Sequence, residues 1–362
     1  MYCKQILLCV VLLSLTFSGC GGSGSGGDGK KTTNVYIAGA EWTGSYSQIY
    51  TATYWKNGVA TNLTTGALTS GANAIAVDTS GNVYVSGYAE NASTYNSIAT
   101  YWKNGVATDL TNKSQASWAG GIAVDSNSNV YVAGILISAS AGPDIAVYWK
   151  NGTPVPLTDG TEDAEAYAIA VDTSGNVYVA GYARNASTFN PIATYWKNGK
   201  AVSLTDGTEE AEAWGIAVDG SGNVYVAGYK SQSISDATAV CWKNGVETDL
   251  TDLPKFAQAD GITVDTSGNV YVAGYFAQDN YLSSITIATY WKNGAPVILN
   301  DASNSNAIAI TTDSSGNVYA AGYTFGPADN EIIATYWKNG KEIDIDSGTN
   351  YAQANGIAIS SY

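Results

Sequence analysis

The sequence has no histidine, one methionine and seven prolines in 362 residues. The missing histidine excludes Ser-His-Asp and Cys-His catalysis, His-ligated zinc and any lyase mechanism that depends on histidine. Carboxylate chemistry is the form of acid–base catalysis that remains, and glycoside hydrolysis by a pair of acids is an example.

Basic residues are scarce as well. The chain has 16 Lys and Arg against 31 Asp and Glu, which gives a formal net charge of −15. Nucleic-acid binding needs clustered positive charge, and here the few basic residues are spread along the chain. We therefore expect no nucleic-acid partner, and the acidic balance favours solubility and cationic or basic partners.

Cysteine is too rare to form a disulfide framework. The first two of the four cysteines, Cys3 and Cys9, lie in a segment that we expect to be removed. Only Cys20 and Cys241 would then remain. We expect Cys241 to be a small buried hydrophobic residue.

The beginning of the chain has the pattern of an export signal. One positive charge, Lys4, precedes an apolar stretch over residues 6–17. This stretch has a length typical of a signal peptide and is too short to span a membrane as a helix. We therefore predict a signal peptide over residues 1–19.

The end of this signal is similar to a lipid-attachment sequence. Phe17-Ser18-Gly19-Cys20 resembles the lipobox of bacterial lipoproteins, although Phe17 stands where that family usually has Leu. The resemblance implies a lipid on Cys20, and ordinary secretion with cleavage near Gly19 is the alternative. Residues 20–32 are rich in Gly and Ser and are expected to form a flexible tether. Because Gly21 and not Asp follows the cysteine, the resemblance favours the outer membrane, with the protein facing the periplasm or the cell surface and touching the membrane only through its lipid.

The rest of the chain is built from seven copies of one unit. The motif Tyr-Trp-Lys-Asn-Gly recurs every 46 to 49 residues, with Cys241 replacing Tyr in one copy. Its tryptophans are Trp55, Trp102, Trp149, Trp196, Trp242, Trp291 and Trp337. Two further motifs, Asn-Val-Tyr and Ile-Ala-Val-Asp or its variants, also occur seven times.

Each unit predicts four short strands. In one copy they cover residues 169–172, 176–182, 192–197 and 201–205, and Asn198-Gly199 between the last two is a strong hairpin signal. Four antiparallel strands in about 40–50 residues are typical of a propeller blade. We therefore predict an all-β, seven-bladed β-propeller over residues 33–362, present as a monomer.

The two ends of the repeat region complement each other. The region begins with the second strand of a unit at 34–39 and ends with the first strand of a unit at 357–360. Pairing of the C-terminal strand with the N-terminal strand would close the ring and remove its exposed sheet edges.

The repeats also resemble a known family. The sequence from Gly215 to Gly228 reads Gly-Ile-Ala-Val-Asp-x-x-Gly-Asn-Val-Tyr-Val-Ala-Gly. This pattern is similar to the SBBP repeats of bacterial β-propellers and more distantly to NHL repeats, over about residues 33–362. The resemblance implies the propeller fold, and such repeats occur in proteins of many functions.

The seven regularly spaced tryptophans are predicted to be core residues. Both faces of each blade carry apolar side chains, and the Trp of one blade is expected to pack over Ala or Gly of the next.

A candidate ligand site lies just before the first strand of each unit, at the rim of the predicted central channel. The residues are those two positions before the Ile of the Ile-Ala-Val-Asp motif, with Trp118 beside Gly120 and with Asn306 taken for the irregular copy. The candidate rim residues are Asn73, Trp118, Tyr167, Trp214, Asp260, Asn306 and Asn355. Such side chains can stack on and hydrogen-bond a sugar or hold a peptide. The alternative is that they are ordinary loop-end residues around a water-filled channel.

Two acidic loops, residues 159–165 and 206–212, are almost identical. Oxygen-rich loops can hold calcium, but neither loop has the spacing of a known calcium loop, and a solvated charge patch is the alternative. The Asp residues of the Asp-x-x-Gly turns are predicted to cap those turns. We expect no metal site and no other cofactor.

These observations favour a non-catalytic binding or scaffold propeller at the cell envelope, with a glycan or an envelope protein bound at the face that carries the variable loops. Catalysis by acids would need a unique pair, and the most prominent acids here occur as duplicated copies. A carboxylate-dependent glycoside hydrolase or lyase, and a structural spacer without a ligand, are the alternatives.

Overall fold

The computed structural model describes residues 33–42, 49–65, 68–139, 142–232, 236–251, 256–277, 285–300, 304–326, 331–345 and 351–361. The predicted signal peptide, the lipid site at Cys20 and the tether over residues 20–32 lie outside the described residues. Within them the secondary structure is β throughout, and no helix there is long and apolar enough to cross a membrane.

The strands form seven four-stranded antiparallel sheets, each of which is one blade. Blade 1 is β28-β1-β2-β3, and blades 2 to 7 follow in chain order from β4 to β27.

The innermost strands of blades 1 to 7 are β28 (Ala352–Ser361), β4 (Ser70–Val77), β8 (Ser117–Val124), β12 (Ala164–Val171), β16 (Glu210–Val218), β20 (Ala257–Val264) and β24 (Ser305–Thr312). The second strands are β1 (Thr33–Trp42), β5 (Val83–Glu90), β9 (Val130–Leu136), β13 (Val177–Arg184), β17 (Val224–Ser231), β21 (Val270–Ala277) and β25 (Val318–Phe325). The third strands are β2 (Tyr50–Lys56), β6 (Ser97–Lys103), β10 (Ile145–Lys150), β14 (Pro191–Lys197), β18 (Thr238–Lys243), β22 (Thr286–Lys292) and β26 (Ile332–Lys338). The outermost strands are β3 (Val59–Asn62), β7 (Val106–Asp109), β11 (Thr153–Pro156), β15 (Lys200–Ser203), β19 (Val246–Asp249), β23 (Ala295–Ile298) and β27 (Lys341–Asp344).

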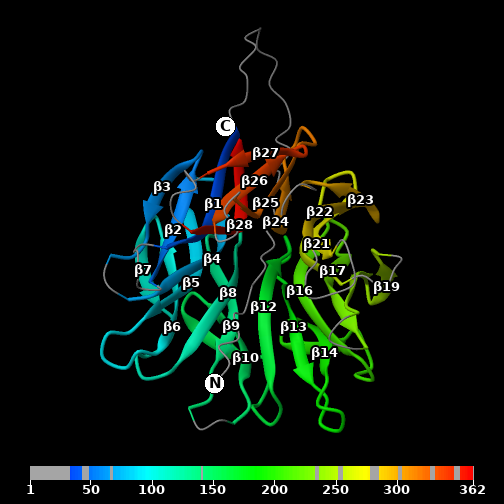
Figure 1. The fold of residues 1–362 in the computed structure, drawn as a ribbon. Helices are drawn as coiled ribbons and strands as arrows, with labels where there is room; N and C mark the ends of the chain where they lie inside the picture. Colours follow the sequence, from blue (N-terminus) through cyan, green and yellow to red (C-terminus); the bar gives the residue numbers. More distant parts are fainter. Residues whose placement is uncertain are drawn as a thin grey trace.

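The ring is closed by the two ends of the chain. Strand β28 pairs antiparallel with β1, with Ile359 opposite Val35, and Figure 1 shows the two strands side by side in red and blue. Each innermost strand contacts the innermost strand of the next blade, and β28 contacts β4. Seven blades and circular closure are confirmed.

The hairpins between the third and outermost strands have the predicted geometry. Asn198 and Gly199 have φ angles of 51° and 80°, as a type I′ turn requires at both central positions. The Asn198 side chain also accepts a hydrogen bond from the Val177 backbone N–H at 2.8 Å and donates one to Asn176 Oδ1 at 2.9 Å. The turn is therefore tied to the neighbouring strand.

The Asp residue between the first two strands of a blade caps its turn, as predicted. Asp172 Oδ1 accepts from the backbone N–H groups of Ser174 and Asn176, and Oδ2 accepts from the Asn176 amide at 2.7 Å and the Tyr178 hydroxyl at 3.0 Å. Burial raises the pKa of Asp172, but these hydrogen bonds outweigh it and leave the pKa below its ordinary value.

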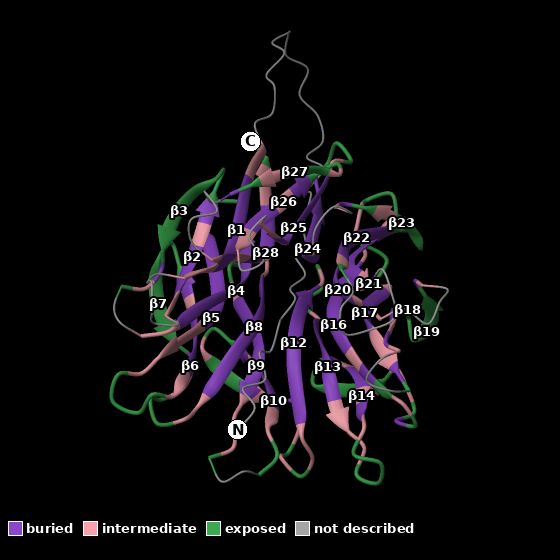
Figure 2. Ribbon diagram, viewed as in Figure 1, coloured by how far each residue is buried: buried purple, intermediate pink, exposed green. Residues whose placement is uncertain are grey.

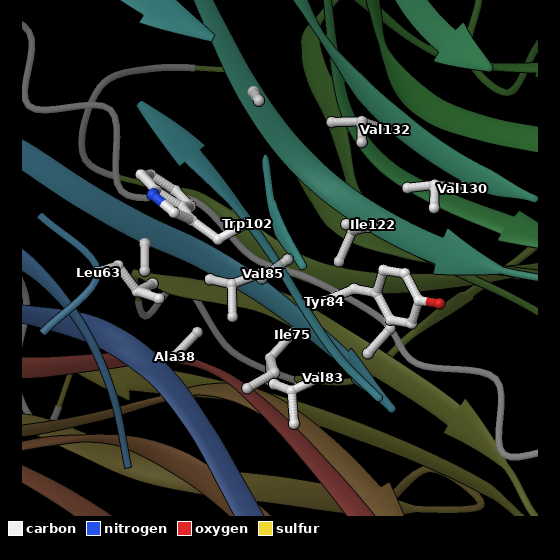
Figure 3. Packing of buried hydrophobic residues seen from close by; sticks show 14 of the residues in the cluster. Ala38, Leu63, Ile75, Val83, Tyr84, Val85, Trp102, Ile122, Val130 and Val132 are labelled. Atoms are coloured by element: carbon white, nitrogen blue, oxygen red, sulfur yellow. The ribbon is translucent and has the colours of Figure 1, made fainter. Parts of the chain in front are cut away.

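The core lies between the blades. All seven repeat tryptophans are less than 2% exposed, and Figure 2 shows the buried inner strands inside a fringe of exposed outer ones. Trp242 of blade 5 belongs to one buried cluster with Ala180 and Ala193 of blade 4, which confirms packing of Trp over the alanines of a neighbouring blade. Figure 3 shows Trp102 among side chains of three blades, from Ala38 in blade 1 to Val132 in blade 3. One buried Trp is worth roughly 4–6 kcal/mol as an upper bound from its apolar area.

Candidate ligand-binding site on the propeller axis

Every innermost strand carries a β-bulge near its middle. The pairing of β12 with β13, for example, skips from Ala166 to Ala168 and leaves Tyr167 as the extra residue. A bulge bends the strand and re-aims the side chain of the residue that it adds. The bulged residues form what we call the bulge ring: Asn73, Gly120 with Gly121, Tyr167, Trp214, Asp260, Ile308 and Asn355.

The bulges depend on glycine in the adjoining strand. A Cβ atom added to Gly181 would lie 1.9 Å from the carbonyl oxygen of Glu165. The other six blades have glycine at the same place, with the same carbonyl within 2.1 Å of the added atom. The recurrent glycine inside the second strand is therefore what lets the bulged backbone approach so closely.

The structure places five of the seven predicted rim residues in the bulge ring: Asn73, Tyr167, Trp214, Asp260 and Asn355. They lie inside the innermost strands, whereas the sequence predicts them just before these strands. The prediction of strand 169–172 was too short because the bulge interrupts the two-residue alternation that identifies a strand; β12 begins at Ala164.

Asn306, the candidate rim residue taken for the irregular copy, is not the structural counterpart of the bulged residues. The bulged residue of blade 7 is Ile308, and Asn306 pairs with Tyr323 two positions earlier. Asn306 and Trp118 occupy equivalent positions in a second set, which we call the polar ring. Its members are Gly71, Trp118, Glu165, Glu212, Gln258, Asn306 and Gln353.

Tyrosines stand opposite most of the polar ring. Tyr182, Tyr229, Tyr275 and Tyr323 pair with its members from blades 4 to 7, and Tyr88 pairs with Gly71. The sequence placed Glu165 and Glu212 in the two acidic loops and not at the rim, and it gave no role to Gln258 and Gln353. The available signal was their shared position, four residues before the Ile of each motif.

Aromatic side chains of neighbouring blades meet at the axis. The rings of Tyr167 and Trp214 stack at 4.4 Å with an angle of 12° between their planes. The Tyr167 hydroxyl donates to Glu212 Oε2 at 3.3 Å, and the Tyr182 hydroxyl donates to Glu165 Oε1 at 2.8 Å. Aromatic rings and carboxylates of blades 4 and 5 thus form one contact network.

The same aromatic groups join blades across the ring. Trp118, Tyr167, Trp214 and Ile308, from blades 3, 4, 5 and 7, belong to one buried cluster. Trp118 is 9% exposed and Trp214 is 8% exposed. These side chains are therefore packed together at the axis, and less than a tenth of each is exposed.

Asparagines of the bulge ring link adjacent blades. Asn355 Nδ2 of blade 1 donates to the Ala72 carbonyl of blade 2 at 3.0 Å, and Asn73 Nδ2 of blade 2 donates to the Ala119 carbonyl of blade 3 at 2.7 Å. These two predicted rim residues therefore have a structural role in holding blades 1 to 3 together.

Several polar atoms of the two rings are buried without a hydrogen bond among the described residues. They are Glu165 Oε2, Trp214 Nε1, Asp260 Oδ2, Asn306 Oδ1 and Gln353 Nε2. Buried polar atoms are nearly always hydrogen-bonded, so each such atom calls for an explanation. Here the five come from five consecutive blades and occur in the same two rings.

Two carboxyl groups at the axis have pKa values above their ordinary range. Asp260 is 2% exposed, and burial raises its pKa to about 8 although the Gln258 amide donates to it at 2.8 Å. Burial also raises the pKa of Glu165, although the neighbouring Tyr182 and Tyr167 hydroxyl groups act to lower it. At neutral pH Asp260 is largely a neutral acid that can donate a hydrogen bond.

The two acidic loops are held by their own hydrogen bonds. Asp159 Oδ1 accepts from the Thr161 backbone at 3.0 Å and hydroxyl at 2.7 Å, and Asp206 binds Thr208 in the same way. Asp163 forms a 2.9 Å ion pair with Arg184. In the described ranges, no group of three or more Cys, Asp or Glu side chains is placed to hold a metal ion. The prediction that these loops are solvated charge patches, with calcium binding as the alternative, stays untested.

Two loops between second and third strands display aromatic side chains. Tyr95 is 72% exposed and Phe189 is 67% exposed. Their φ angles are 56° and 62°, in the left-handed region that bulky residues rarely adopt. Asn91 and Asn185 hold the two loops through hydrogen bonds to the following backbone N–H groups. The repeated Asn-Ala-Ser-Thr-aromatic-Asn sequence was the signal for this shared loop.

The fold and its closure define the protein as a seven-bladed β-propeller with four antiparallel strands per blade. Residues 159–186, which include β12 and β13 of blade 4, match the family model of the SBBP beta-propeller repeat. No curated protein matches the chain.

Solved structures are similar in fold at low sequence identity. The polysaccharide lyase Uly1 is 10% identical, with a TM-score of 0.50, over 86% of this chain and 88% of the lyase. The acylaminoacyl peptidase of Pyrococcus horikoshii is 12% identical, with a TM-score of 0.50, over 87% of this chain and only half (50%) of the peptidase. A fucose lectin from Kordia zhangzhouensis, solved with methyl-fucoside, is 23% identical over 36% of this chain and 95% of the lectin, with a TM-score of 0.28. These likenesses concern the fold and leave the activity of this chain open.

Proposed function

We propose that the protein is a non-catalytic, glycan-binding propeller of the cell envelope, and that it binds its ligand at the axial end formed by the bulge ring and the polar ring. One observation carries the proposal: five consecutive blades each bring a buried polar atom without a hydrogen-bond partner to these rings. A ligand that supplies the missing partners would recover the free energy that these atoms lose on burial.

The chemistry of these atoms favours a sugar. Trp214 Nε1 and Gln353 Nε2 are donors, Asn306 Oδ1 is an acceptor, and protonated Asp260 can donate. A sugar hydroxyl both donates and accepts, so a run of hydroxyl groups can satisfy such an alternating set. The aromatic edges of Trp118 and Trp214 add apolar contacts for the C–H groups of a sugar ring. An envelope protein is the alternative ligand.

Binding is tested on a glycan array, with envelope crosslinking beside it. The double variant Asn306→Ala with Gln353→Ala removes one unpartnered acceptor and one unpartnered donor, and we expect it to lose at least tenfold in affinity for any captured glycan. Asn62→Ala, on the exposed outermost strand β3, is the matched control and keeps full affinity. Unchanged capture by the double variant would refute the axial site, and an array without any signal would refute glycan binding.

A carboxylate hydrolase or lyase is the second candidate, and one observation favours it. The raised pKa of Asp260, about 8, would make this group a proton donor at neutral pH. Turnover of an oligosaccharide that stops with Asp260→Asn would replace the binding proposal by this one. Binding without turnover in both the natural protein and this variant supports the binding proposal.

The envelope location rests on the lipobox resemblance. A lipid on Cys20 would send the protein into the detergent phase of a detergent–water partition, and Cys20→Ser would return it to the aqueous phase. A natural protein that stays in the aqueous phase would support ordinary secretion instead.

A further inference from the structure

Carboxyl groups accumulate where blades 4 and 5 meet at the axis. Glu165 and Glu212 occupy neighbouring positions of the polar ring. The charges of Asp163 and Asp144 act on Glu165 and raise its pKa in addition to the effect of burial. Arg184 lies 5.8 Å from the centre of the Tyr182 ring, and it forms an ion pair with Asp163 at 2.9 Å and donates to the Phe189 carbonyl at 2.7 Å.

One carboxylate oxygen of Glu165, Oε2, has no hydrogen-bond partner among the described residues. The residue is 8% exposed, and its Oε1 accepts from the Tyr182 hydroxyl at 2.8 Å while Oε2 is buried without a hydrogen bond. A buried carboxylate is costly unless a positive charge or further donors compensate it. A ligand ammonium group, with three N–H donors and a positive charge, would compensate Oε2 in both respects.

Tyrosine side chains contact both Glu165 and Glu212. Tyr167 reaches Glu212 with its hydroxyl and stacks on Trp214 of the next blade, and Tyr182 reaches Glu165. The hydroxyl oxygens of Tyr167 and Tyr182, which donate to these carboxylates, can also accept a hydrogen bond from an ammonium group.

The two rings carry no positive charge of their own. None of the residues in the bulge ring or the polar ring is Lys or Arg. An anionic glycan, with carboxylate or sulfate groups, would therefore meet only like charge there.

We propose that the glycan bound at the axis is cationic: an oligosaccharide of de-N-acetylated amino sugars, with one ammonium group bound between Glu165 and Glu212 beside Tyr167 and Trp214. This inference rests on the proposed function, because it names the class of ligand for the same site. A sugar is favoured over a lysine-rich peptide because the polar ring also holds an unpartnered acceptor, Asn306 Oδ1, and an unpartnered donor, Gln353 Nε2, which suit the hydroxyl groups of a sugar.

Calorimetric titration of the full chain with four hexamers tests the inference. They are glucosamine hexamer, N-acetylglucosamine hexamer, galacturonate hexamer and hexalysine. We expect the glucosamine hexamer to bind at least tenfold more tightly than its N-acetylated form, with no binding of the galacturonate hexamer. Salt weakens the preferred complex, because part of its attraction is electrostatic.

Variants that remove one carboxylate charge test which residue binds the ammonium group. Glu165→Gln keeps the shape of the side chain and removes its charge, and we expect a loss of tenfold or more for the glucosamine hexamer with little change for the N-acetylated one. Thermal unfolding shows whether Glu165→Gln folds. If it does not, Glu212→Gln tests the loss of affinity for the glucosamine hexamer in its place. Asp109→Asn on the exposed strand β7 removes the same charge far from both rings in the sheet and is expected to change nothing.

The outcomes separate the inference from the proposed function. Equal binding of the neutral and amino forms, or preferred binding of galacturonate, overturns the cationic class while axial glycan binding stands. Binding of hexalysine without either sugar overturns the glycan and favours a basic peptide. Binding of none of the four overturns the cationic class, and the glycan array then decides the proposed function by itself.

Discussion

The glycine opposite each bulge gives a sharp test of how the axial site is built. Gly181→Ala adds one methyl group, whose carbon would lie 1.9 Å from the Glu165 carbonyl oxygen and 3.0 Å from the Ala166 Cα. Since Cβ atoms essentially never approach another heavy atom within 3.0 Å, the two strands must separate by about 1 Å. Both atoms in conflict belong to backbone, so no side chain can swing aside.

The expected cost follows from this displacement. Overpacking of a well-packed region costs about 1–3 kcal/mol, and conflict with backbone belongs at the upper end of that range. For a chain of this length, 1 kcal/mol corresponds to about 1.5 °C in Tm. We therefore expect Gly181→Ala to lower Tm by about 3–5 °C in a thermal unfolding experiment. Ligand binding at the axis should weaken in parallel, because the shifted strand carries Glu165 and Tyr167.

Gly220→Ala is the matched control. An added Cβ at Gly220 meets no atom within 4 Å, and no left-handed φ is required there. Loss of glycine then restricts mainly the unfolded chain, which leaves Tm unchanged or slightly higher. Equal Tm values for the two variants would refute the claim that the bulge depends on the absent side chain at Gly181.

Three further perturbations test the core, the closure and the buried acid. Trp196→Ala removes a fully buried repeat tryptophan and should cost about 3–5 kcal/mol of unfolding free energy, measured by urea denaturation; a loss below 1 kcal/mol would contradict inter-blade packing. Deletion of residues 351–362 removes β28, so blade 1 loses its innermost strand, and we expect aggregation or proteolysis of the product; a soluble, protease-resistant product would contradict circular closure. The pKa of Asp260 is raised from 3.8 to about 8, so between those pH values the folded state keeps a proton that the unfolded state releases, and stability must fall as pH rises through this window. The natural protein should therefore lose Tm between pH 5 and pH 8, and Asp260→Asn should lose less. An unaltered pH dependence would show that Asp260 is not buried as described.

The turn-cap acids do not interfere with this last measurement. The pKa of Asp172 and of its counterparts in the other blades is lowered below 3.8. Their contribution to stability is therefore complete above the ordinary pKa and is lost only as pH falls through the lowered one. Between pH 5 and pH 8 they contribute no slope.

The sequence by itself determined the architecture. Asn198-Gly199 predicts its hairpin from two residues, because few residue pairs accept positive φ at both positions of a type I′ turn. The offset between the first and last half-units predicts the pairing of β1 with β28. The Asn-Gly hairpin is local and occurs seven times, so counting it is enough to count the blades.

Only the tertiary structure decided the make-up of the axial site. The bulge at Tyr167 interrupts the alternation of side chains along β12, so the sequence pattern begins the strand too late, at residue 169 instead of Ala164. The bulged residue of blade 7, Ile308, also differs from Asn306, the residue that the sequence pattern suggested. Tyr167 and Trp214 are separated by about one repeat in the chain and are brought together only because adjacent blades converge on one axis. Their burial, and the unpartnered oxygen of Glu165, depend on that convergence. A repeat pattern describes each blade alone, whereas the site is formed by contacts between blades.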